Sequence, residues 1–139
     1  MTITTPLQGI KVLDMSRVLA GPWAGQMLAD LGADVIKVEP PDNPDMTRDE
    51  GSSAVLNAEL TGTYFMPQAA GKRSLVLDLK TSQGRDVFFK LVATADVVIQ
   101  NYAGSALDRL GLGYDDLAQI RPDLIYCSLT GYGRTGPKA

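Results

Sequence analysis

Basic side chains fall at the ends of several apolar segments of this sequence, where they could bind an anionic ligand. Seven lysines and arginines share this placement: Arg17, Lys72, Arg73, Lys80, Arg109, Arg134 and Lys138. The alternative is a scatter of solvated surface charges, which is the ordinary state of these residue types. Arg17 is the best placed, because it follows the first apolar segment almost directly.

Two further residues could recognise a ligand through their chemical type. Asn101 and Tyr102 follow a later apolar segment, and an amide beside an aromatic ring could hydrogen-bond to and stack on a heteroaromatic group. The alternative is a polar residue that ends a strand and a half-buried tyrosine. Cys127 lies inside an apolar segment, where a lone cysteine is more often a small core residue than a nucleophile.

Several kinds of chemistry are excluded by residues that the sequence lacks. It contains no histidine, so a Ser-His-Asp triad, a histidine base and a His-ligated metal cannot be formed. A single cysteine excludes an internal disulfide and a Cys-clustered metal site. The segment from Gly111 to Asp116 lacks the last glycine of a dinucleotide-binding motif, and no P-loop motif occurs. We expect no metal, and any acid–base or nucleophilic chemistry in this chain would have to use carboxylate, lysine, tyrosine or hydroxyl groups.

Composition indicates a soluble globular domain. The 139 residues are 45% hydrophobic and 21% charged, which suffices for one domain with a core. The net charge of −3 gives no general attraction to nucleic acid. No apolar run approaches the roughly 20 residues that span a bilayer, and residues 1–8 do not resemble a signal peptide. We therefore expect neither nucleic-acid nor membrane partners, and a cytoplasmic location.

The elements that must position these residues alternate between strands and helices. Residues 10–39 read as a βαβ unit, with a turn at 16–21, a helix bearing Trp23, Met27, Leu28 and Leu31, and a second strand at 35–38. Gly21 and Gly25 are interpreted as sites of close helix–strand packing. Residues 42–70 read as a long polar excursion of the kind that is usually functional or disordered.

The alternation continues through the second half of the chain. Strands are predicted at 74–79, 96–100 and 124–129, and a helix capped by Thr81 follows the first of them. Short helices are predicted at 105–110 and 114–120, and a glycine-rich loop at 130–137. This order predicts an α/β fold with a doubly wound, mainly parallel sheet, whose binding crevice lies at the carboxyl ends of the strands. The last strand lacks a covering helix, so we expect the N-terminal part of a longer protein.

A series of short motifs, taken together, resembles one protein family. They are PLQGIKVLD at 6–14, AGP at 20–22, LGADVIKVE at 31–39, DMTR at 45–48, KRSLVLDLK at 72–80, ADV at 95–97, NY at 101–102, ALDRLG at 106–111 and GYGRTGP at 131–137. Their order and spacing resemble the amino-terminal part of the class III coenzyme A transferases. That family includes formyl-CoA transferase, carnitine CoA-transferase and the α-methylacyl-CoA racemases.

The resemblance implies a fold, an assembly and a set of ligand contacts. Residues 1–139 would form the N-terminal part of a Rossmann-like large domain, without the smaller domain, and two full-length subunits would interlock as a homodimer. Coenzyme A or acyl-CoA, bound as a substrate, would contact nine residues: Val18, Leu19, Ala20, Leu77, Lys80, Asn101, Tyr102, Ala106 and Arg109. Lys80 and Arg109 suit the phosphates, and Tyr102 suits the adenine or the pantetheine arm. Pro40 replaces a family arginine, and Lys138 matches a later lysine contact.

The resemblance places the catalytic groups downstream of this chain. In the transferases an aspartate attacks the acyl-CoA thioester, and CoA passes to a carboxylic acid through an aspartyl thioester. In the racemases a histidine and an aspartate exchange the proton next to the thioester. The expected function is the CoA-binding portion of a class III CoA transferase, with this chain inactive alone. The alternatives are the matching portion of a racemase and a non-catalytic CoA- or nucleotide-binding module.

Overall fold

A five-stranded parallel sheet forms the centre of the molecule. The computed structural model describes residues 4–137. The strands are β1 (Lys11–Asp14), β2 (Asp34–Glu39), β3 (Arg73–Val76), β4 (Val97–Gln100) and β5 (Ile125–Ser128). They lie in the order β3-β2-β1-β4-β5, and all four neighbouring pairs are parallel. This is the order of a doubly wound sheet, so the predicted α/β class is confirmed.

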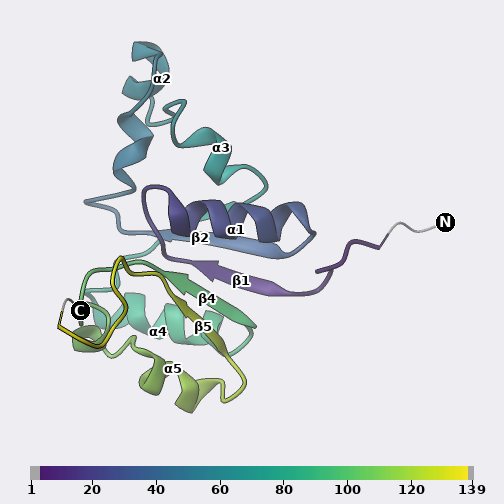
Figure 1. Cartoon of the computed structure of the whole chain (residues 1–139), viewed down its shortest axis with the longest axis vertical. Coiled ribbons are helices and arrows are strands. Elements are labelled where there is room, and N and C mark those ends of the chain that lie inside the picture. The colour runs from purple at the N-terminus through teal and green to yellow at the C-terminus, as the bar shows by residue number, and fades with distance from the viewer. Residues whose placement is uncertain (1–3, 138–139) are drawn as a thin grey trace.

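Helices cover both faces of the sheet (Figure 1). Helix α1 (Ala20–Asp30) lies on one face, and α4 (Ser82–Val92) and α5 (Tyr114–Ile120) lie on the other. The chain leaves β1 toward α1 and leaves β4 toward the opposite face, through the 3-10 turn η2 (Asp108–Leu110). The carboxyl ends of β1 and β4 therefore form the switch point at which doubly wound sheets bind their ligands.

The two faces of the sheet have separate apolar cores. The α4/α5 side is the larger one, with Phe88, Val92 and Val98 fully buried at its centre. The α1 side is a smaller cluster around Val12 and Val35. Residues 37 and 39 of β2 continue that second face, and both are charged. The α1 face is thus apolar at the amino ends of the strands and ionic at their carboxyl ends.

The excursion after β2 is more ordered than the sequence indicates. It contains the 3-10 turn η1 (Met46–Asp49) and the short helices α2 (Ala54–Ala58) and α3 (Met66–Ala69). Helix α3 packs against α1, and α2 lies at the far tip of the molecule (Figure 1). Residues 42–70 do form a long excursion, as predicted, but its short helices were not predicted. Its helices have four or five residues, too few for a periodic apolar pattern.

Several predicted boundaries are confirmed and others move. The Thr81 hydroxyl accepts a hydrogen bond from the Gly84 amide at 3.0 Å, which confirms the predicted cap of α4. Strand β3 ends at Val76 rather than at residue 79. Helix α1 begins at Ala20, so Ala20 belongs to the helix and not to the preceding turn.

Helix α1 exposes apolar side chains on its outer side. Leu19, Trp23, Met27 and Leu31 recur at every fourth position and are 44–51% exposed, and we call them the α1 stripe. Leu28 instead packs on the sheet. Across residues 4–137, no helix combines the length and apolar character needed to cross a bilayer.

Candidate functional site

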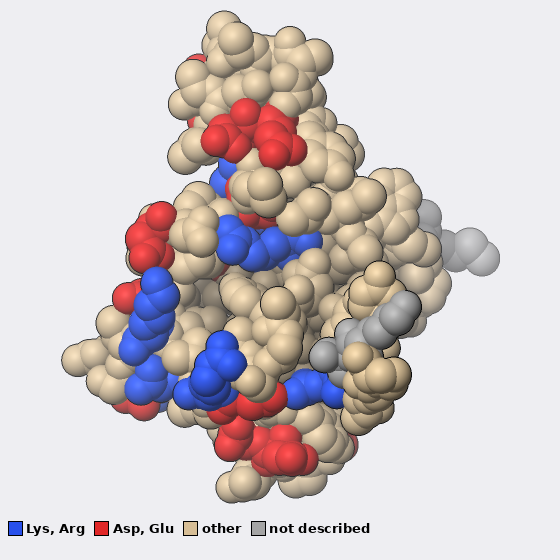
Figure 2. Space-filling model, turned by 60° about the vertical axis from the view of Figure 1, so that its left-hand side comes forward, with Lys and Arg blue, Asp and Glu red and all other residues tan. Residues whose placement is uncertain are grey.

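The candidate site lies at the carboxyl edge of the sheet, around the ends of β1 and β4. Figure 2 brings this edge forward and shows lysine and arginine side chains around a hollow in the surface. Three segments meet there: the turn after β1, the segment after β4 and the segment after β3. Eight of the nine predicted contact residues belong to these segments, and the ninth, Ala20, begins helix α1 directly after the turn.

The turn after β1 begins with two side-chain contacts to Ser16. The carboxylate of Asp14 accepts hydrogen bonds from the Ser16 amide, at 2.9 Å, and from the Ser16 hydroxyl. The Nζ of Lys37 donates to the Ser16 carbonyl at 2.8 Å. Both backbone polar groups of Ser16 are therefore bound by buried side chains.

The next two residues are held in the same way from other elements. The Asn101 side chain accepts a hydrogen bond from the Arg17 amide at 2.8 Å and donates one to the Arg17 carbonyl at 2.7 Å. The Val18 amide lies 3.1 Å from both carboxylate oxygens of Asp45. Five consecutive backbone polar groups of the turn, from the Ser16 amide to the Val18 amide, thus each contact a side chain.

Val18 adopts a backbone conformation that valine rarely takes. Its φ is +69°, in the left-handed region. A β-branched residue there is an outlier, and such conformations cost on the order of 1–3 kcal/mol. The surrounding hydrogen bonds must impose this conformation on the turn.

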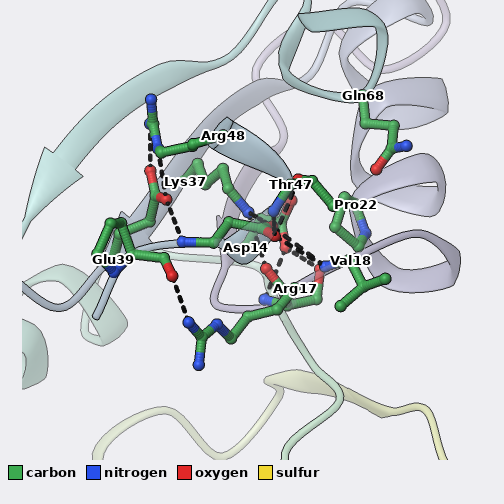
Figure 3. Close-up of polar contacts among 12 residues, drawn as sticks. Asp14, Arg17, Val18, Pro22, Lys37, Glu39, Thr47, Arg48 and Gln68 are labelled. Atoms are coloured by element: carbon green, nitrogen blue, oxygen red, sulfur yellow. Dashed lines mark hydrogen bonds and ion pairs between the residues drawn. The ribbon is translucent and has the colours of Figure 1, made fainter. Parts of the chain in front are cut away.

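Three ion pairs lie behind the turn, on the α1 face of the sheet (Figure 3). They are Lys72–Asp14 at 2.6 Å, Lys37–Asp45 at 3.1 Å and Arg48–Glu39 at 2.5 Å. The side chains of the first two pairs are at most 3% exposed. Lys72, Asp45 and Arg48 all come from the excursion between β2 and β3, so the pairs fasten the excursion to the sheet.

The pKa values of three side chains in these ion pairs are shifted from their usual values. Burial alone would raise the pKa of Glu39, but the hydrogen bond from Arg48 and nearby positive charges lower the pKa of this carboxyl below its usual value. Burial would also raise the pKa of Asp45, but the charge and hydrogen bond of Lys37 and the amides of Thr47 and Val18 together lower it. Burial lowers the pKa of Lys72 in spite of its contact with Asp14.

The two glycines of α1 leave the space that this arrangement needs. A Cβ at Gly25 would lie 2.6 Å from an Asp14 carboxylate oxygen and 3.0 Å from the Nζ of Lys72. A Cβ at Gly21 would overlap the side chain of Ser16. The prediction that both glycines serve close helix–strand packing is confirmed.

Two cavities open beside the turn. The larger has a volume of about 900 Å³ and is lined by Ala20, residues 101–105 and residues 128–134. The smaller has a volume of about 140 Å³ and is lined by Arg17, residues 38–40, Asp42, Asn43, residues 77–80, Tyr102, Leu107 and Leu110. Tyr102 lines both cavities and separates them. Burial raises the pKa of its hydroxyl, which therefore stays protonated at neutral pH.

The structure brings most of the predicted contact residues to these cavities. Ala20, Asn101 and Tyr102 line the larger one, and Leu77, Lys80 and Tyr102 line the smaller one. The other four predicted residues, Val18, Leu19, Ala106 and Arg109, line neither cavity. Val18 and Leu19 lie in the turn directly before Ala20, which begins helix α1.

The two cations predicted to meet phosphates have weak partners. The Nζ of Lys80 lies 3.2 Å from the Asp42 carboxylate, and both side chains are more than half exposed. The hydrogen bond from Lys80, together with its charge, lowers the pKa of Asp42. The guanidinium of Arg109 donates to the Ser105 hydroxyl at 2.7 Å. An exposed ion pair such as Lys80–Asp42 contributes about 0–1 kcal/mol, so a phosphate can displace Asp42 from Lys80.

The other basic residues singled out in the sequence have separate roles. The guanidinium of Arg17 donates to the carbonyls of Asn43 and Pro44. Lys72 is buried with Asp14, and Arg73 begins β3 at the opposite edge of the sheet. Arg134 pairs with Asp108 at 2.6 Å. Lys138 lies outside the described residues.

Sequence reasoning missed the side chains that shape the turn. Lys37 and Asp45 were not candidate site residues, yet both hold its backbone. A charged residue inside the apolar run of residues 35–38 was the available signal for Lys37, because a buried lysine needs a partner. Within residues 4–137, no three histidine, cysteine or acidic side chains gather as metal ligands would.

Comparisons with known proteins agree with this geometry. The profile of CoA-transferase family III matches residues 7–139. Succinate–glutarate CoA-transferase of Agrobacterium fabrum is 53% identical over 96% of this chain, and human succinyl-CoA:glutarate CoA-transferase is 46% identical over 95%. The chain covers 34% and 30% of these two relatives, or about a third of their length.

Solved structures of related proteins have the same fold. A CAIB/BAIF family protein from Brucella suis superimposes with a TM-score of 0.87 at 48% identity, over 97% of this chain and 36% of that protein. The protein Rv3272 of Mycobacterium tuberculosis, in a mutant form, superimposes with a TM-score of 0.87 at 44% identity, over 97% and 35%. The predicted family is therefore confirmed, and this chain belongs to CoA-transferase family III.

Proposed function

We propose that this chain forms the CoA-binding edge of an enzyme that moves CoA from an acyl-CoA thioester to a carboxylic acid. The observation that carries the proposal is that two cavities and two weakly paired cations, Lys80 and Arg109, lie together at the carboxyl edge of the sheet. The chain that carries them belongs to CoA-transferase family III. In this proposal the acyl-CoA lies across the end of β4, and two subunits of the intact protein form the working dimer.

The phosphates of CoA are assigned to Lys80 and Arg109. Both cations are exposed and weakly paired, so they can exchange their present partners for phosphate oxygens. A charge-assisted hydrogen bond contributes about 1.5–3 kcal/mol when it is well formed. The amino end of α1 adds partial positive charge on the same edge.

The smaller cavity suits a flat, partly apolar group such as adenine. Pro40, Leu77 and Leu79 contribute apolar surface, and the ring of Tyr102 closes one side. Pro40 provides packing surface where the family arginine would provide a charge. The larger cavity would then receive the pantetheine arm and the thioester.

The covalent steps require groups outside residues 1–139. We assign the nucleophile to a downstream aspartate. Its carboxylate attacks the thioester carbonyl, and the carbon–sulfur bond breaks to release CoA thiolate. The thiolate attacks the aspartyl carbonyl of the resulting anhydride and releases the acyl carboxylate. The acceptor carboxylate then attacks the aspartyl thioester and releases CoA thiolate, which leaves a second anhydride. The thiolate attacks the acceptor's carbonyl in this anhydride, forms the new acyl-CoA and releases the aspartate carboxylate.

The proposal is tested with the intact protein and the substrates of its relatives. Succinyl-CoA and glutarate are the first pair to assay, because enzymes named for succinate and glutarate are 46–53% identical to this chain. Formation of glutaryl-CoA is followed by mass spectrometry. Lys80→Ala and Arg109→Ala should each raise the KM for acyl-CoA about tenfold, as expected for loss of about 1.4 kcal/mol of binding.

The matched control is an arginine at the opposite edge of the sheet. Arg73→Ala should leave the KM unchanged, since Arg73 pairs with Asp34 at the amino end of β3. Equal KM values in all the variants would remove Lys80 and Arg109 from the site. The 139-residue chain alone should transfer no CoA, and turnover that survives repurification would place the nucleophile within it.

A further inference from the structure

We propose that Lys37 and Asp45 are positioning residues that hold the turn after β1 in its ligand-binding shape. The proposal rests on the proposed function, since the ligand in question is CoA. Neither side chain can contact a ligand directly, because Lys37 is 3% exposed and Asp45 is 1% exposed. They act on the ligand through the backbone of Ser16 and Val18.

The geometry points to the turn as the purpose of this pair. Lys37 extends from β2 and divides its Nζ between the Asp45 carboxylate, at 3.1 Å, and the Ser16 carbonyl, at 2.8 Å. Asp45 divides its carboxylate between Lys37, the Val18 amide and Thr47. One ion pair therefore holds an acceptor and a donor two residues apart in the turn.

The strained conformation of Val18 requires such an anchor. Without the Asp45 carboxylate, the Val18 amide has no acceptor among the contacts described for the turn, and Val18 loses the hydrogen bond that most directly holds it at positive φ. That change would redirect the chain at Leu19 and Ala20. Ala20 lines the larger cavity, so the pair controls the wall of the cavity without touching it.

The anchor also joins the excursion to the site. Asp45 caps η1 by accepting hydrogen bonds from the amide and hydroxyl of Thr47, and its own amide donates to Glu39 at 3.0 Å. The next residues of the excursion are fixed by Arg48, which pairs with Glu39 and lies 3.9 Å from the ring centre of Phe65. A displacement of the excursion would therefore move the acceptor of the Val18 amide.

If the pair served only stability, a variant that stays folded without it would bind CoA as the wild type does. A positioning role predicts weaker binding of CoA by such a variant. Replacing a buried ion pair with apolar residues of similar size is often neutral for stability, whereas removing one partner is not. The double variant Lys37→Met/Asp45→Leu removes both anchors together. We expect it to remain folded at the temperature of the assay, with a lower thermal midpoint because Ser16, Val18 and Thr47 lose buried partners. It should bind CoA about tenfold more weakly, as judged by calorimetry. The KM for acyl-CoA should rise equally, with kcat nearly unchanged.

A milder variant keeps the test decisive if the first one fails to fold. Lys37→Met/Asp45→Asn keeps the acceptor that serves Thr47 and removes the anchor on Ser16. We expect its affinity for CoA to fall about threefold, which corresponds to less than 1 kcal/mol. The matched control is Asp96→Asn/Arg121→Met, which removes a partly exposed pair at 3.0 Å beside the amino end of β4. The control should leave the affinity unchanged.

The outcomes separate this proposal from the proposed function. Both are overturned if the intact wild-type protein does not bind CoA. Only the positioning role is overturned if the wild type binds CoA and a folded double variant binds it equally well. An equal loss of affinity in the control would also overturn it, because the effect would then follow from lost stability.

Discussion

Removing the charge of Lys72 should destabilise the protein more than removing any exposed charge. Lys72→Met leaves the carboxylate of Asp14, which is fully buried, without its cation. The loss of one partner of a buried ion pair costs about 3–5 kcal/mol. The hydrogen bond from Lys72 to the Pro22 carbonyl, at 2.7 Å, is lost as well. Methionine keeps most of the apolar stem, so a cavity contributes little.

The adjacent residue provides the matched control. Arg73 also makes an ion pair, with Asp34 at 2.7 Å, but the two side chains are 64% and 44% exposed. An exposed pair contributes about 0–1 kcal/mol. Arg73→Met should therefore lower the free energy of unfolding far less than Lys72→Met, although the two pairs have almost the same length.

Urea unfolding followed by far-ultraviolet circular dichroism measures both variants. A second substitution tests the cause, because Asp14→Asn in the Lys72→Met background removes the unpaired charge but keeps an acceptor for the Ser16 amide. That double variant should recover at least half of the loss. Equal losses in Lys72→Met and Arg73→Met would refute the reasoning, as would a double variant less stable than Lys72→Met.

Three further predictions concern packing, pH and assembly. Gly25→Ala should lower the free energy of unfolding by about 1–3 kcal/mol through overpacking against Asp14, whereas Gly131→Ala, at an open position, should change it by less than about 0.5 kcal/mol in urea titrations. Because the pKa values of Glu39 and Asp45 are lowered, the stability that they contribute is present at neutral pH and is lost as the pH falls below about 4.5. Thermal midpoints from pH 7 to pH 3 should therefore fall less steeply in Glu39→Gln than in the wild type. The 139-residue chain should self-associate through the α1 stripe, and light scattering that shows a monomer at every concentration would contradict this.

The strands were predictable from the sequence because they are short apolar runs between helical segments. The sequence predicted a parallel sheet with its binding edge at the carboxyl ends of the strands, but not the strand order, because doubly wound sheets occur with more than one order. The short helices of the excursion were not predictable, because they are fixed by tertiary contacts. Arg48 illustrates this, since it reaches back to Glu39 and forward to the Leu60 carbonyl.

The location of the candidate site was predictable from the sequence, but the contacts that its side chains make were not. The sequence places Asn101 at the end of β4, yet it does not reveal that the amide of this side chain is paired with the peptide of Arg17. The roles of Lys37 and Asp45 depend on contacts with the backbone of Ser16 and Val18, which follow another strand. Such contacts join residues far apart in the chain, and local sequence patterns do not predict them.

Hydrogen exchange of the intact protein, with and without CoA, tests the central claim most directly. The claim is that CoA binds at the carboxyl edge of the sheet, across the ends of β1, β3 and β4. We predict that saturating CoA slows exchange in peptides covering residues 15–21, 77–81 and 101–110, and leaves the amino ends of the strands unchanged. No protection by CoA, or protection confined to the amino edge around Lys11 and Arg73, would contradict the account.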